Sequence, residues 1–417
     1  MINTPKLSND CFALPRGITW TPVDDALNLL EKRLRTIVET KSIPVALSDG
    51  YILAASLFAP RSSPPFTNSA VDGYAFKGEL SAGQHCFSVL EGRALAGSSY
   101  NCLVRPDQAV RILTGAALPQ GTDTVVLEED VNIHGSNLFV KGPLERGANV
   151  REKGEDVLEG SKLFEKGHQI QPQDIGRLIS VGVADVVVFR SLKVAVISTG
   201  SELCEIGNSP KSGQIFDANR PMLKAILRRW GMDVVDIGII QDRASLVRQA
   251  LNDATRQADV VITTAGASAG DEDYVSAALK ETGQMSIWRL AVKPGRPLAL
   301  GMWNGVPVFG LPGNPVAAFV CTLIFARPSL LQLAGAGFEK PRFVKLPAGF
   351  SKTKKSGRRE YLRARVRQDT IEVFVSEGSG RISGLTWAEG LVELPDEAME
   401  IKPGDLVNYI SYSSFGI

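Results

Sequence analysis

The sequence predicts a multidomain α/β plus β protein, in which a central, doubly wound and mostly parallel sheet accompanies a β-rich domain and a small C-terminal β-barrel. Between residues 191 and 334, apolar runs alternate with helical patterns, which is typical of βαβ units. Residues 85–150 instead hold short alternating runs between Gly, Pro, Asn and Asp turns, and such alternation returns after Pro341. A chain of 417 residues is also too long for one ordinary domain.

We expect four domains, because the pattern changes from β to α/β near residue 190 and returns to β near Gly335. The expected ranges are 40–58 with 160–190 for an elongated linking domain, 59–159 for the β-rich domain, 18–39 with 191–334 for the α/β domain, and 335–417 for the barrel.

The overall charge indicates no charged macromolecule as a partner. The chain has 46 Lys and Arg residues against 45 Asp and Glu residues, a net charge of +1. Such a chain has no global field that would steer it to nucleic acid or to an anionic membrane. No stretch approaches ~20 uninterrupted apolar residues, and residues 1–16 lack the apolar core of a signal peptide. We therefore expect no nucleic acid and no membrane.

Cysteine and histidine are sparse and scattered. The three histidines lie far apart, which argues against a histidine-rich metal site. An odd, sparse set of cysteines argues against a disulfide framework or a zinc cluster and favours a reducing compartment. We therefore expect a cytoplasmic protein. The cysteines are Cys11, Cys86, Cys102, Cys204 and Cys321.

The N-terminal third begins with helical spacing over residues 22–39, where Thr21 or Asp24 could cap the helix. A strand, a turn and a short helix at 52–55 are expected next. Two adjacent prolines then force an extended loop within 61–76, and an Asp-Gly turn ends it. Its Thr, Asn, Ser and Asp side chains could present a site or only close a surface turn.

Two polar segments stand out in the β-rich region. Residues 111–116 end a strand in a polar turn, and the charged loop 151–156 closes the region. A charged loop is most often simply solvated, so the local pattern alone does not assign a function to it.

In the α/β region, polar loops follow four predicted strands, and a helix that Asn219 would cap lies between the first two. In parallel sheets, ligands bind beyond the carboxyl ends of the strands. We therefore expect these loops to meet at one cleft. They are Ser198–Glu202 after the first strand, Asp242 after the second, the small-residue loop running into Asp271-Glu272-Asp273 after the third, and Pro312–Pro315 after the last.

Two later segments leave alternatives open. The apolar helix expected over 315–334 could belong to the core or to an oligomer interface. The basic run from Lys352 to Arg367 could form an anion patch, but its alternation with apolar residues favours a solvated strand face.

The residue types at the predicted cleft favour phosphoryl or nucleotidyl chemistry. Mg²⁺ binds through one or two carboxylates together with substrate phosphates. Arg289, Lys293 and Arg296 could pair with an oxyanion, and a loop of small residues lets backbone N–H groups approach one. The first α/β strand is not followed by GxGxxG, and GxxxxGK[ST] is absent, which disfavours a dinucleotide dehydrogenase and a P-loop NTPase.

As a set, six motifs resemble the MoeA family, which includes the gephyrin E domain, from about residue 18 to the C-terminus. They are Pro65–Ala75, Arg111–Ala116, Ser198–Leu203, Ala265–Tyr274, Lys293-Pro294-Gly295 and Gly310–Val316, in the family's order. The resemblance implies a molybdopterin molybdenumtransferase, which inserts molybdenum from molybdate into adenylylated molybdopterin with Mg²⁺ and releases AMP. It also implies a four-domain homodimer whose α/β domain is of the molybdopterin-binding kind.

Carried over position by position, the resemblance implies two sets of site residues. The catalytic set is Asp72, Thr114, Glu202, Asp242, Asp273 and Lys293, and the substrate-binding set is Arg151, Asp156, Ser268, Arg289, Arg296, Pro312 and Pro315. Glu202 and Asp242 would hold or orient Mg²⁺ and the pyrophosphate, whereas Asp273 would contact the pterin and Lys293 the anions. Pro312 and Pro315 match the loop that lies on the molybdate side of the family's site. Asp72 and Thr114, from the β-rich domain, would complete the pocket within one chain or across the dimer.

Two positions depart from the family pattern. A double glycine is replaced by Ala265-Gly266, and a methyl should fit there only where φ is negative. Arg289 stands where some relatives have lysine; it still suits phosphate but cannot act as a neutral base.

Two other functions remain as alternatives. A molybdopterin adenylyltransferase shares the α/β domain, but the β-rich domain and the barrel count against it. A gephyrin-like scaffold is disfavoured by the acids of the cleft. Partners implied by the resemblance include the adenylyltransferase and the molybdoenzymes that accept the cofactor.

Overall fold

The computed structural model describes residues 20–265, 274–281, 285–295, 297–376, 378 and 380–417. The chain divides into two compact units, Ser42–Val188 and Met1–Lys41 with Phe189–Ile417. The expected four-domain boundaries are finer than this division and stay a prediction.

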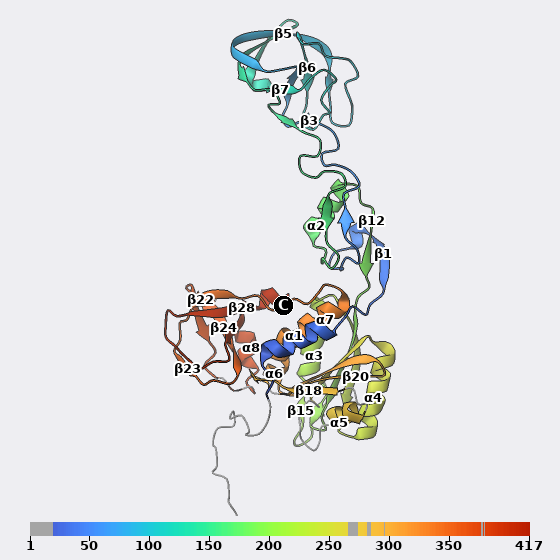
Figure 1. The fold of residues 1–417 in the computed structure, drawn as a ribbon, viewed down its shortest axis with the longest axis vertical. Helices are drawn as coiled ribbons and strands as arrows, with labels where there is room; N and C mark the ends of the chain where they lie inside the picture. Colours follow the sequence, from blue (N-terminus) through green and yellow to red (C-terminus); the bar gives the residue numbers. More distant parts are fainter. Residues whose placement is uncertain (1–19, 266–273, 282–284, 296, 377, 379) are drawn as a thin grey trace, which may run out of the picture. The chain divides into compact units, whose positions relative to one another are not determined.

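The unit Ser42–Val188 contains a six-stranded sheet of order β7-β4-β6-β5-β9-β8, drawn in Figure 1. Its strands are β4 (Gly73–Phe76), β5 (Leu80–Ala94), β6 (Gln108–Ile112), β7 (Thr124–Leu127), β8 (Val131–His134) and β9 (Asn137–Leu144). Tyr74 and Phe76 join one buried cluster and Ala75 joins another, because successive side chains of a strand point to opposite faces. The strand β4 is therefore buried on both faces.

The rest of this unit is built from short strand pairs and one helix, α2 (Pro172–Ser180), around a separate buried cluster that includes Leu53 and Leu178. The pairs are β1 (Thr40–Pro44) with β12 (Asp185–Phe189), β2 (Leu57–Phe58) with β11 (Lys162–Phe164), and β3 (Asn68–Ser69) with β10 (Val150–Arg151). Single 3-10 turns lie at Val45–Leu47 and Glu128–Asp130.

The second unit holds the predicted mostly parallel sheet, of order β16-β13-β17-β21-β20-β18. The first four strands are parallel to one another, and β20 runs antiparallel to both of its neighbours, β21 and β18. A two-residue turn, Asn304-Gly305, with φ of 50° and 79°, reverses the chain between β20 and β21. The strands are β13 (Lys193–Thr199), β16 (Asp233–Ile240), β17 (Val260–Thr264), β18 (Met285–Arg289), β20 (Pro297–Trp303) and β21 (Val306–Leu311).

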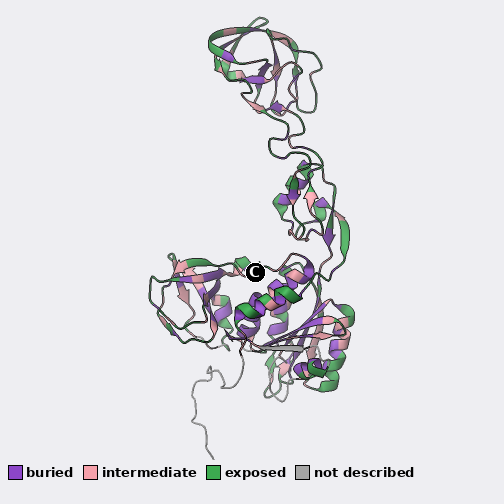
Figure 2. Cartoon of the chain, viewed as in Figure 1, coloured by how far each residue is buried: buried purple, intermediate pink, exposed green. Residues whose placement is uncertain are grey.

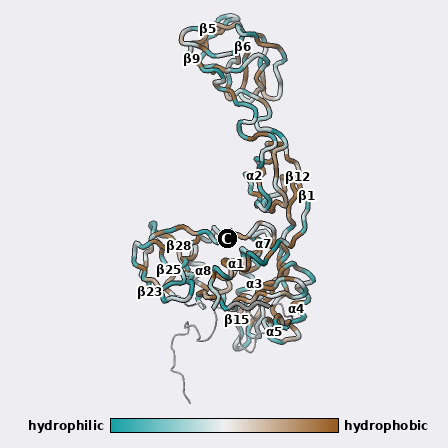
Figure 3. The backbone as a smooth tube through the Cα atoms, viewed as in Figure 1, coloured by the Kyte–Doolittle hydropathy of each residue, from teal (hydrophilic) through white to brown (hydrophobic). Residues whose placement is uncertain are grey.

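Helices cover both faces of this sheet, as a doubly wound fold requires. The helices α4 (Ala244–Gln257) and α5 (Tyr274–Glu281) pack on one face, and α3 (Asn219–Arg229) and α6 (Pro315–Cys321) pack on the other. Figure 3 shows hydrophilic and hydrophobic stretches mixed along α4, as expected for a helix with one buried face. The small pair β14 (Leu203–Cys204) and β15 (Ile215–Phe216) follows the first strand. The fold class predicted for this region is confirmed.

The apolar segment after β21 belongs to the core. It is α6, a π-helical turn at Thr322–Ala326 and α7 (Arg327–Ala334). Pro315–Ala334 is long and apolar enough to cross a membrane, but 89% of its apolar window is buried inside the protein. Figure 2 shows the buried residues concentrated in the central sheet and the helices against it. Of the two sequence alternatives, the structure supports the core.

The C-terminal region curls a sheet of order β19-β24-β26-β28-β22, with β25 paired to β24. An isolated bridge between Ala348 and Ile371 connects its two ends, as a barrel requires. The strands are β19 (Val292–Lys293), β22 (Val344–Pro347), β24 (Arg359–Arg367), β25 (Thr370–Val373), β26 (Gly390–Leu394) and β28 (Leu406–Ser411); β23 (Lys352–Lys354) pairs with β27 (Met399–Ile401), and α8 (Ser383–Trp387) and a 3-10 turn (Tyr412–Phe415) complete the region.

Three local expectations are wrong. The first helix, α1 (Val23–Arg33), follows Pro22 without a side-chain cap, because Asp24 instead accepts two hydrogen bonds from Arg359. No helix forms at 52–55, where the backbone N–H of Leu53 pairs with the carbonyl of His168. At α3, the capping carboxylate belongs to Asp217, which accepts from the N–H groups of Asn219 and Arg220.

The basic C-terminal strand is also not a solvated face. Lys354, Glu360 and Arg363 are buried, with 2%, 7% and 5% exposure. Each is neutralised or satisfied locally: the Lys354 ammonium, for example, donates to the carbonyls of Lys355 and Glu397. Because a buried charge needs such partners, these residues specify how the barrel packs.

Candidate functional site

The carboxyl edge of the central sheet gathers the first two predicted loops. β13 and β16 are parallel neighbours, so their carboxyl ends lie side by side. The backbone N–H of Ser201 donates to Oδ2 of Asp242 at 2.9 Å, and the N–H of Asp242 donates to Oγ of Ser201 at 3.3 Å. This reciprocal pair fixes the Asp242 carboxylate beside the loop that carries Glu202. Glu202 is exposed.

The neighbouring strand ends are tied together below this edge. The hydroxyls of Ser198 and Thr264, both fully buried, lie 2.8 Å apart in a hydrogen bond between β13 and β17. Thr264 is followed by Ala265, which has a φ of 66°. The condition of negative φ at this position is therefore not met, and the alanine methyl is held in the left-handed region. The hydrogen bond between Ser198 and Thr264 therefore fixes the end of β17, the strand that precedes the small-residue loop.

The loop Pro312–Pro315 leaves β21 at the same edge and is held on both sides. Nδ2 of Asn219 donates to the carbonyl oxygen of Gly313 at 2.7 Å. Asn314 caps α6, since its side chain accepts from the N–H of Val316 at 3.1 Å. The predicted pair Pro312 and Pro315 is thus placed beside the N-terminus of α3. Sequence analysis gave Asn219 only a capping role and missed this contact.

Five of the predicted or neighbouring positions cannot be placed in this way. Ser268, Asp271, Glu272, Asp273 and Arg296 lie outside the described residues. Arg289 is described at the end of β18, where its carbonyl accepts from the N–H of Thr21. The roles expected for these residues stay predictions.

Lys293 leaves the central domain and enters the C-terminal sheet. Together with Val292 it forms β19, which pairs in parallel with Arg359 and Glu360 of β24. Gly295 then packs so closely on α6 that an added Cβ would lie 2.9 Å from Sγ of Cys321. Lys293 is therefore held between the barrel and the helix that follows the Pro312–Pro315 loop.

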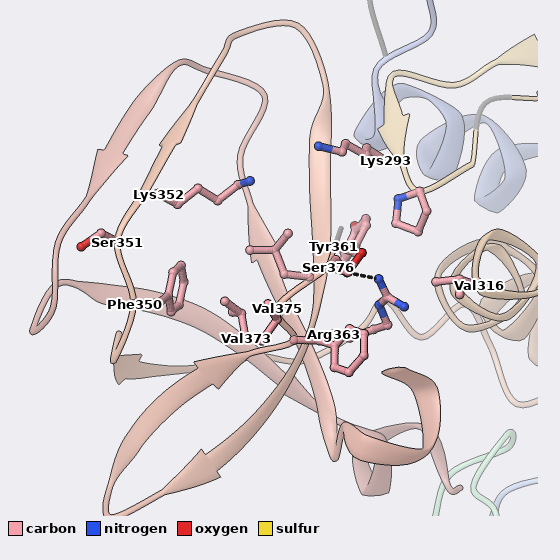
Figure 4. Close-up of a pocket in the computed structure, with 13 residues that line it drawn as sticks. Lys293, Val316, Phe350, Ser351, Lys352, Tyr361, Arg363, Val373, Val375 and Ser376 are labelled. Atoms are coloured by element: carbon pink, nitrogen blue, oxygen red, sulfur yellow. Dashed lines mark hydrogen bonds between the residues drawn. The ribbon is translucent and has the colours of Figure 1, made fainter. Parts of the chain in front are cut away.

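A cavity of about 190 Å³ opens at this junction. Figure 4 shows Lys293 and Lys352 extending toward each other across it, with Val316 of α6 on one side. One part of the wall is cationic and the other is apolar, from Phe350 and Val373 to Val375. Sequence analysis did not select Lys352 individually, since the alternating pattern around it indicated a solvated strand.

Arg363 also lines the cavity, but its donors serve the protein itself. Its guanidinium donates to the carbonyls of Arg381, Ser376 and Gly378 and lies 4.9 Å from the ring centroid of Phe374. Burial lowers the pKa of this guanidinium. Arg363 therefore holds the wall in place and adds positive charge, whereas Lys293 and Lys352 extend toward each other across the cavity.

In the unit Ser42–Val188, the structure joins Asp72 with Thr114. Oδ1 of Asp72 accepts from the hydroxyl of Thr114 at 2.6 Å and from its backbone N–H at 2.7 Å. The hydrogen bond from the Thr114 hydroxyl, then that from its N–H, lowers the pKa of the Asp72 carboxyl. Arg151 pairs with Asn68 in β10–β3, and the N–H of Asp156 donates to the carbonyl of Ser63; both side chains are exposed.

The two carboxylates at the sheet edge fit a hard cation. Mg²⁺ commonly uses one or two carboxylates and takes its remaining ligands from substrate phosphates and water. Oδ2 of Asp242 is held by Ser201, and within the described part of the chain neither Oδ1 of Asp242 nor the Glu202 carboxylate has a hydrogen-bond or ion-pair partner. No cluster of three or more His, Cys, Asp or Glu side chains suited to a metal occurs in the described part of the chain. The donor set therefore suits a cation shared with a phosphate rather than a closed structural site.

Three family models match separate parts of this chain. The MoeA N-terminal region (domain I and II) matches residues 21–182, a probable molybdopterin binding domain matches 195–332, and the MoeA C-terminal region (domain IV) matches 345–412. The molybdopterin molybdenumtransferase of Haemophilus influenzae is 34% identical over 393 residues, covering 92% of this chain and 97% of the relative. The chain belongs to the MoeA family.

Other MoeA relatives agree. A molybdopterin molybdenumtransferase of Staphylococcus aureus is 30% identical over 93% of this chain and 95% of its own length. The crystal structure of the MoeA molybdopterin biosynthesis protein of Pyrococcus horikoshii OT3 superposes with a TM-score of 0.82 at 27% identity, covering 94% of this chain and all of that one. The Ser201–Asp242 pair and the Pro312–Pro315 loop lie within the matched molybdopterin-binding domain, and Lys352 lies within the matched C-terminal domain.

Proposed function

We propose that this protein is a molybdopterin molybdenumtransferase, which inserts molybdenum from molybdate into adenylylated molybdopterin and releases AMP. The full-length similarity to enzymes of that name supports the reaction class. The assignment of the site depends on one observation: the unit that contains the central sheet has two separate groups of charged side chains. Carboxylates stand at the edge of the sheet, and a cationic cavity stands at the start of the barrel.

The carboxylate edge is the place for the pyrophosphate of the adenylylated substrate. Glu202 and Asp242 would hold Mg²⁺ there, and the ion would neutralise charge on the phosphates while the anhydride is cleaved. Ser201 fixes the orientation of the Asp242 carboxylate through two hydrogen bonds. A fixed carboxylate need not reorganise when charge moves to the leaving AMP, and this lowers the barrier.

The cavity at Lys293 is the place for molybdate. A tetrahedral dianion needs a concave site with positive charge, and the described residues of this wall include two lysines and an arginine. Lys293 and Lys352 supply that charge from two different elements, and Arg363 anchors the wall. The apolar side chains around them exclude water, which strengthens the electrostatic attraction.

Other features of this function are part of the same proposal. We infer that the protein acts in the cytoplasm as a homodimer, that Asp72, Thr114, Arg151 and Asp156 contribute to the substrate site, and that the adenylyltransferase and the acceptor molybdoenzymes are its partners. The hydrogen-bonded, depressed-pKa carboxylate of Asp72 supports a role as a permanent anion or hydrogen-bond acceptor.

An assay of nucleotide release tests the function. The purified chain, given adenylylated molybdopterin, Mg²⁺ and molybdate, should release AMP and yield a cofactor that activates an apo-molybdoenzyme. Omission of molybdate should abolish activation. Release of pyrophosphate from ATP and molybdopterin would instead identify an adenylyltransferase. Full activation of the molybdoenzyme by a double variant, Asp242→Ala with Lys293→Met, would favour a scaffold and overturn the proposal.

A further inference from the structure

A buried carboxylate lies behind the two lysines of the cavity. Glu360 sits on β24 directly opposite Lys293 in the pairing with β19. Its Oε1 lies 3.6 Å from Nζ of Lys293, and its Oε2 lies 3.3 Å from Nζ of Lys352. The three side chains are only 9%, 14% and 12% exposed. Glu360 is not part of the cavity wall, so it acts on a bound ligand through the two lysines.

The contacts of this carboxylate are those of a shared counter-ion rather than of a tight salt bridge. A charge-assisted N–H···O bond is usually about 2.7–2.9 Å long, and both distances here exceed that. Oε2 is buried and makes no hydrogen bond, although the Lys352 ammonium is close enough for electrostatic attraction. The single negative charge of Glu360 is therefore shared by the two positive charges of Lys293 and Lys352. Together these three side chains have a net charge of +1.

We propose that Glu360 is an internal counter-ion which sets the strength of oxyanion binding in this cavity. This inference rests on the proposed role of the cavity as the molybdate site. Without Glu360, the cavity would offer a dianion one more unit of net positive charge beside Lys293 and Lys352, and the dianion would bind more tightly. With it, binding stays weak enough for the oxyanion to be passed on to the dithiolene. Equally tight binding of substrate and transition state would not speed the reaction.

The same charge count limits occupation by other dianions. Sulfate has the shape and charge of molybdate, so a doubly cationic cavity would retain it as well. Glu360 therefore lowers the occupation of the site by every tetrahedral dianion, sulfate included. Its effect is electrostatic, so it should be largest at low ionic strength and fade as salt is added.

Calorimetric titration of the full chain with sodium molybdate, and separately with sodium sulfate, tests this inference at low ionic strength. Glu360→Gln removes one negative charge and should tighten binding of both anions by about tenfold. Lys352→Met should weaken both. The double variant Lys352→Met with Glu360→Gln restores a net charge of +1 and should return to within about threefold of the unaltered chain.

Glu372→Gln is the matched control. Glu372 lies on β25 of the same barrel and pairs with Arg365 at 2.9 Å. It alternates with Val373, a wall residue, and so points away from the cavity. The control should leave both affinities unchanged. A similar gain in this variant would mean that total charge, not the position of Glu360, controls binding, and would overturn the proposal.

The outcomes separate this inference from the assignment of the site. If Lys293→Met leaves molybdate affinity unchanged, the cavity is not the molybdate site and both proposals fail. If Lys293→Met weakens binding while a folded Glu360→Gln fails to strengthen it, only the counter-ion role fails, and Glu360 is a purely structural partner of the lysines. If Glu360→Gln does not fold, the double variant decides: an affinity as low as that of Lys352→Met alone would overturn the inference.

Discussion

Ala265 and Gly313 meet at the carboxyl edge of the central sheet, where a Cβ on Gly313 would lie 3.2 Å from the Cβ of Ala265. Ala265 keeps its methyl at a φ of 66°. A left-handed backbone costs an L-residue about 1–2 kcal/mol. Glycine avoids this cost, although its unfolded chain has more freedom. We expect Ala265→Gly to raise the free energy of unfolding by about 1 kcal/mol.

Urea denaturation measures this change, with Ala299→Gly as the control. Ala299 is a buried residue of β20, so the same substitution there should lower the free energy of unfolding by about 1 kcal/mol. Equal losses in the two variants would mean that the φ of Ala265 carries no strain.

Asn219 should prove necessary for molybdate use through the loop it holds. Asn219→Asp replaces the Nδ2 donor by an acceptor facing the carbonyl of Gly313. A buried unsatisfied group costs about 1–3 kcal/mol, and the loop should loosen. We expect the KM for molybdate to rise severalfold with a smaller fall in kcat. Asn208→Asp, on an exposed turn, should change neither. A fall in kcat alone would place Asn219 in the chemistry instead.

Asp242 should be needed for its charge as well as for its hydrogen bonds. Asp242→Asn can still accept from the N–H of Ser201 but cannot neutralise a cation. The rate of AMP release should fall on the order of a hundredfold, while the melting temperature stays near that of the unaltered protein. Asp253→Asn, on the exposed side of α4, removes a charge outside the site and should retain full activity. Raising the Mg²⁺ concentration should partly restore Asp242→Asn.

The depressed pKa of Asp72 should depend on Thr114. Thr114→Val removes the hydroxyl bond but keeps the backbone N–H bond, so the pKa should rise toward the ordinary value of 3.8 without reaching it. Carboxyl-resolved NMR titration measures this shift.

The sign of the pH effect follows from the same contact. A carboxyl whose pKa is lowered by folding stabilises the protein above its unfolded pKa, and that contribution is lost as the pH falls through the folded pKa. The stability of the Thr114→Val variant should therefore be less dependent on pH below about 4. An unchanged pKa of Asp72 would contradict the geometry of the pair.

Arg359 should hold α1 to the barrel, because its guanidinium makes two parallel hydrogen bonds to one carboxylate of that helix. Its Nη1 and Nη2 donate to the two oxygens of Asp24 at 2.9 and 2.7 Å, and Nη2 also donates to Asp396 at 3.1 Å. Burial lowers the pKa of this guanidinium, but the hydrogen bonds to Asp24 and the charges nearby raise it overall. Arg359→Lys keeps the charge but loses the bidentate geometry, and we expect a loss of about 1–2 kcal/mol in unfolding free energy. Asp24→Asn measured alongside should lose less, because Asp24 is 61% exposed.

The parts of the fold that could be predicted are those whose sequence pattern lies within a short stretch of the chain. Alternating strands and helices gave the mostly parallel sheet, because a buried strand and an amphipathic helix each show their period within a few residues. The predicted cap at Asp24 was wrong, because Arg359, distant in the sequence, donates to its carboxylate. The predicted helix at 52–55 was wrong, because the backbone there hydrogen-bonds to segments distant in the sequence. No local window contains either partner.

The site was predictable only where a loop follows a strand. Ser201 and Asp242 meet because parallel strands end at one edge. Lys352, Glu360 and Arg363 were missed as a group, because strand alternation suggested that polar side chains face water. The position of Glu360 beside Lys293 follows from the pairing of β24 with β19, two strands far apart in the sequence. The family resemblance is confirmed, whereas the roles expected for all the site residues, including Ser268, Asp273 and Arg296, stay predictions.

The two-residue strand β19 has a mechanical consequence. The chain from Val292 to Gly295 is hydrogen-bonded to the barrel on one side and packed on α6 on the other. The segment that carries Lys293 thus belongs to both the α/β domain and the barrel. Because this segment joins the two domains, they cannot rotate independently around the cavity. The width of the cavity should therefore stay constant when an anion binds. The affinity for different anions should depend on their ionic radius, because the cavity would not change its shape to fit each of them.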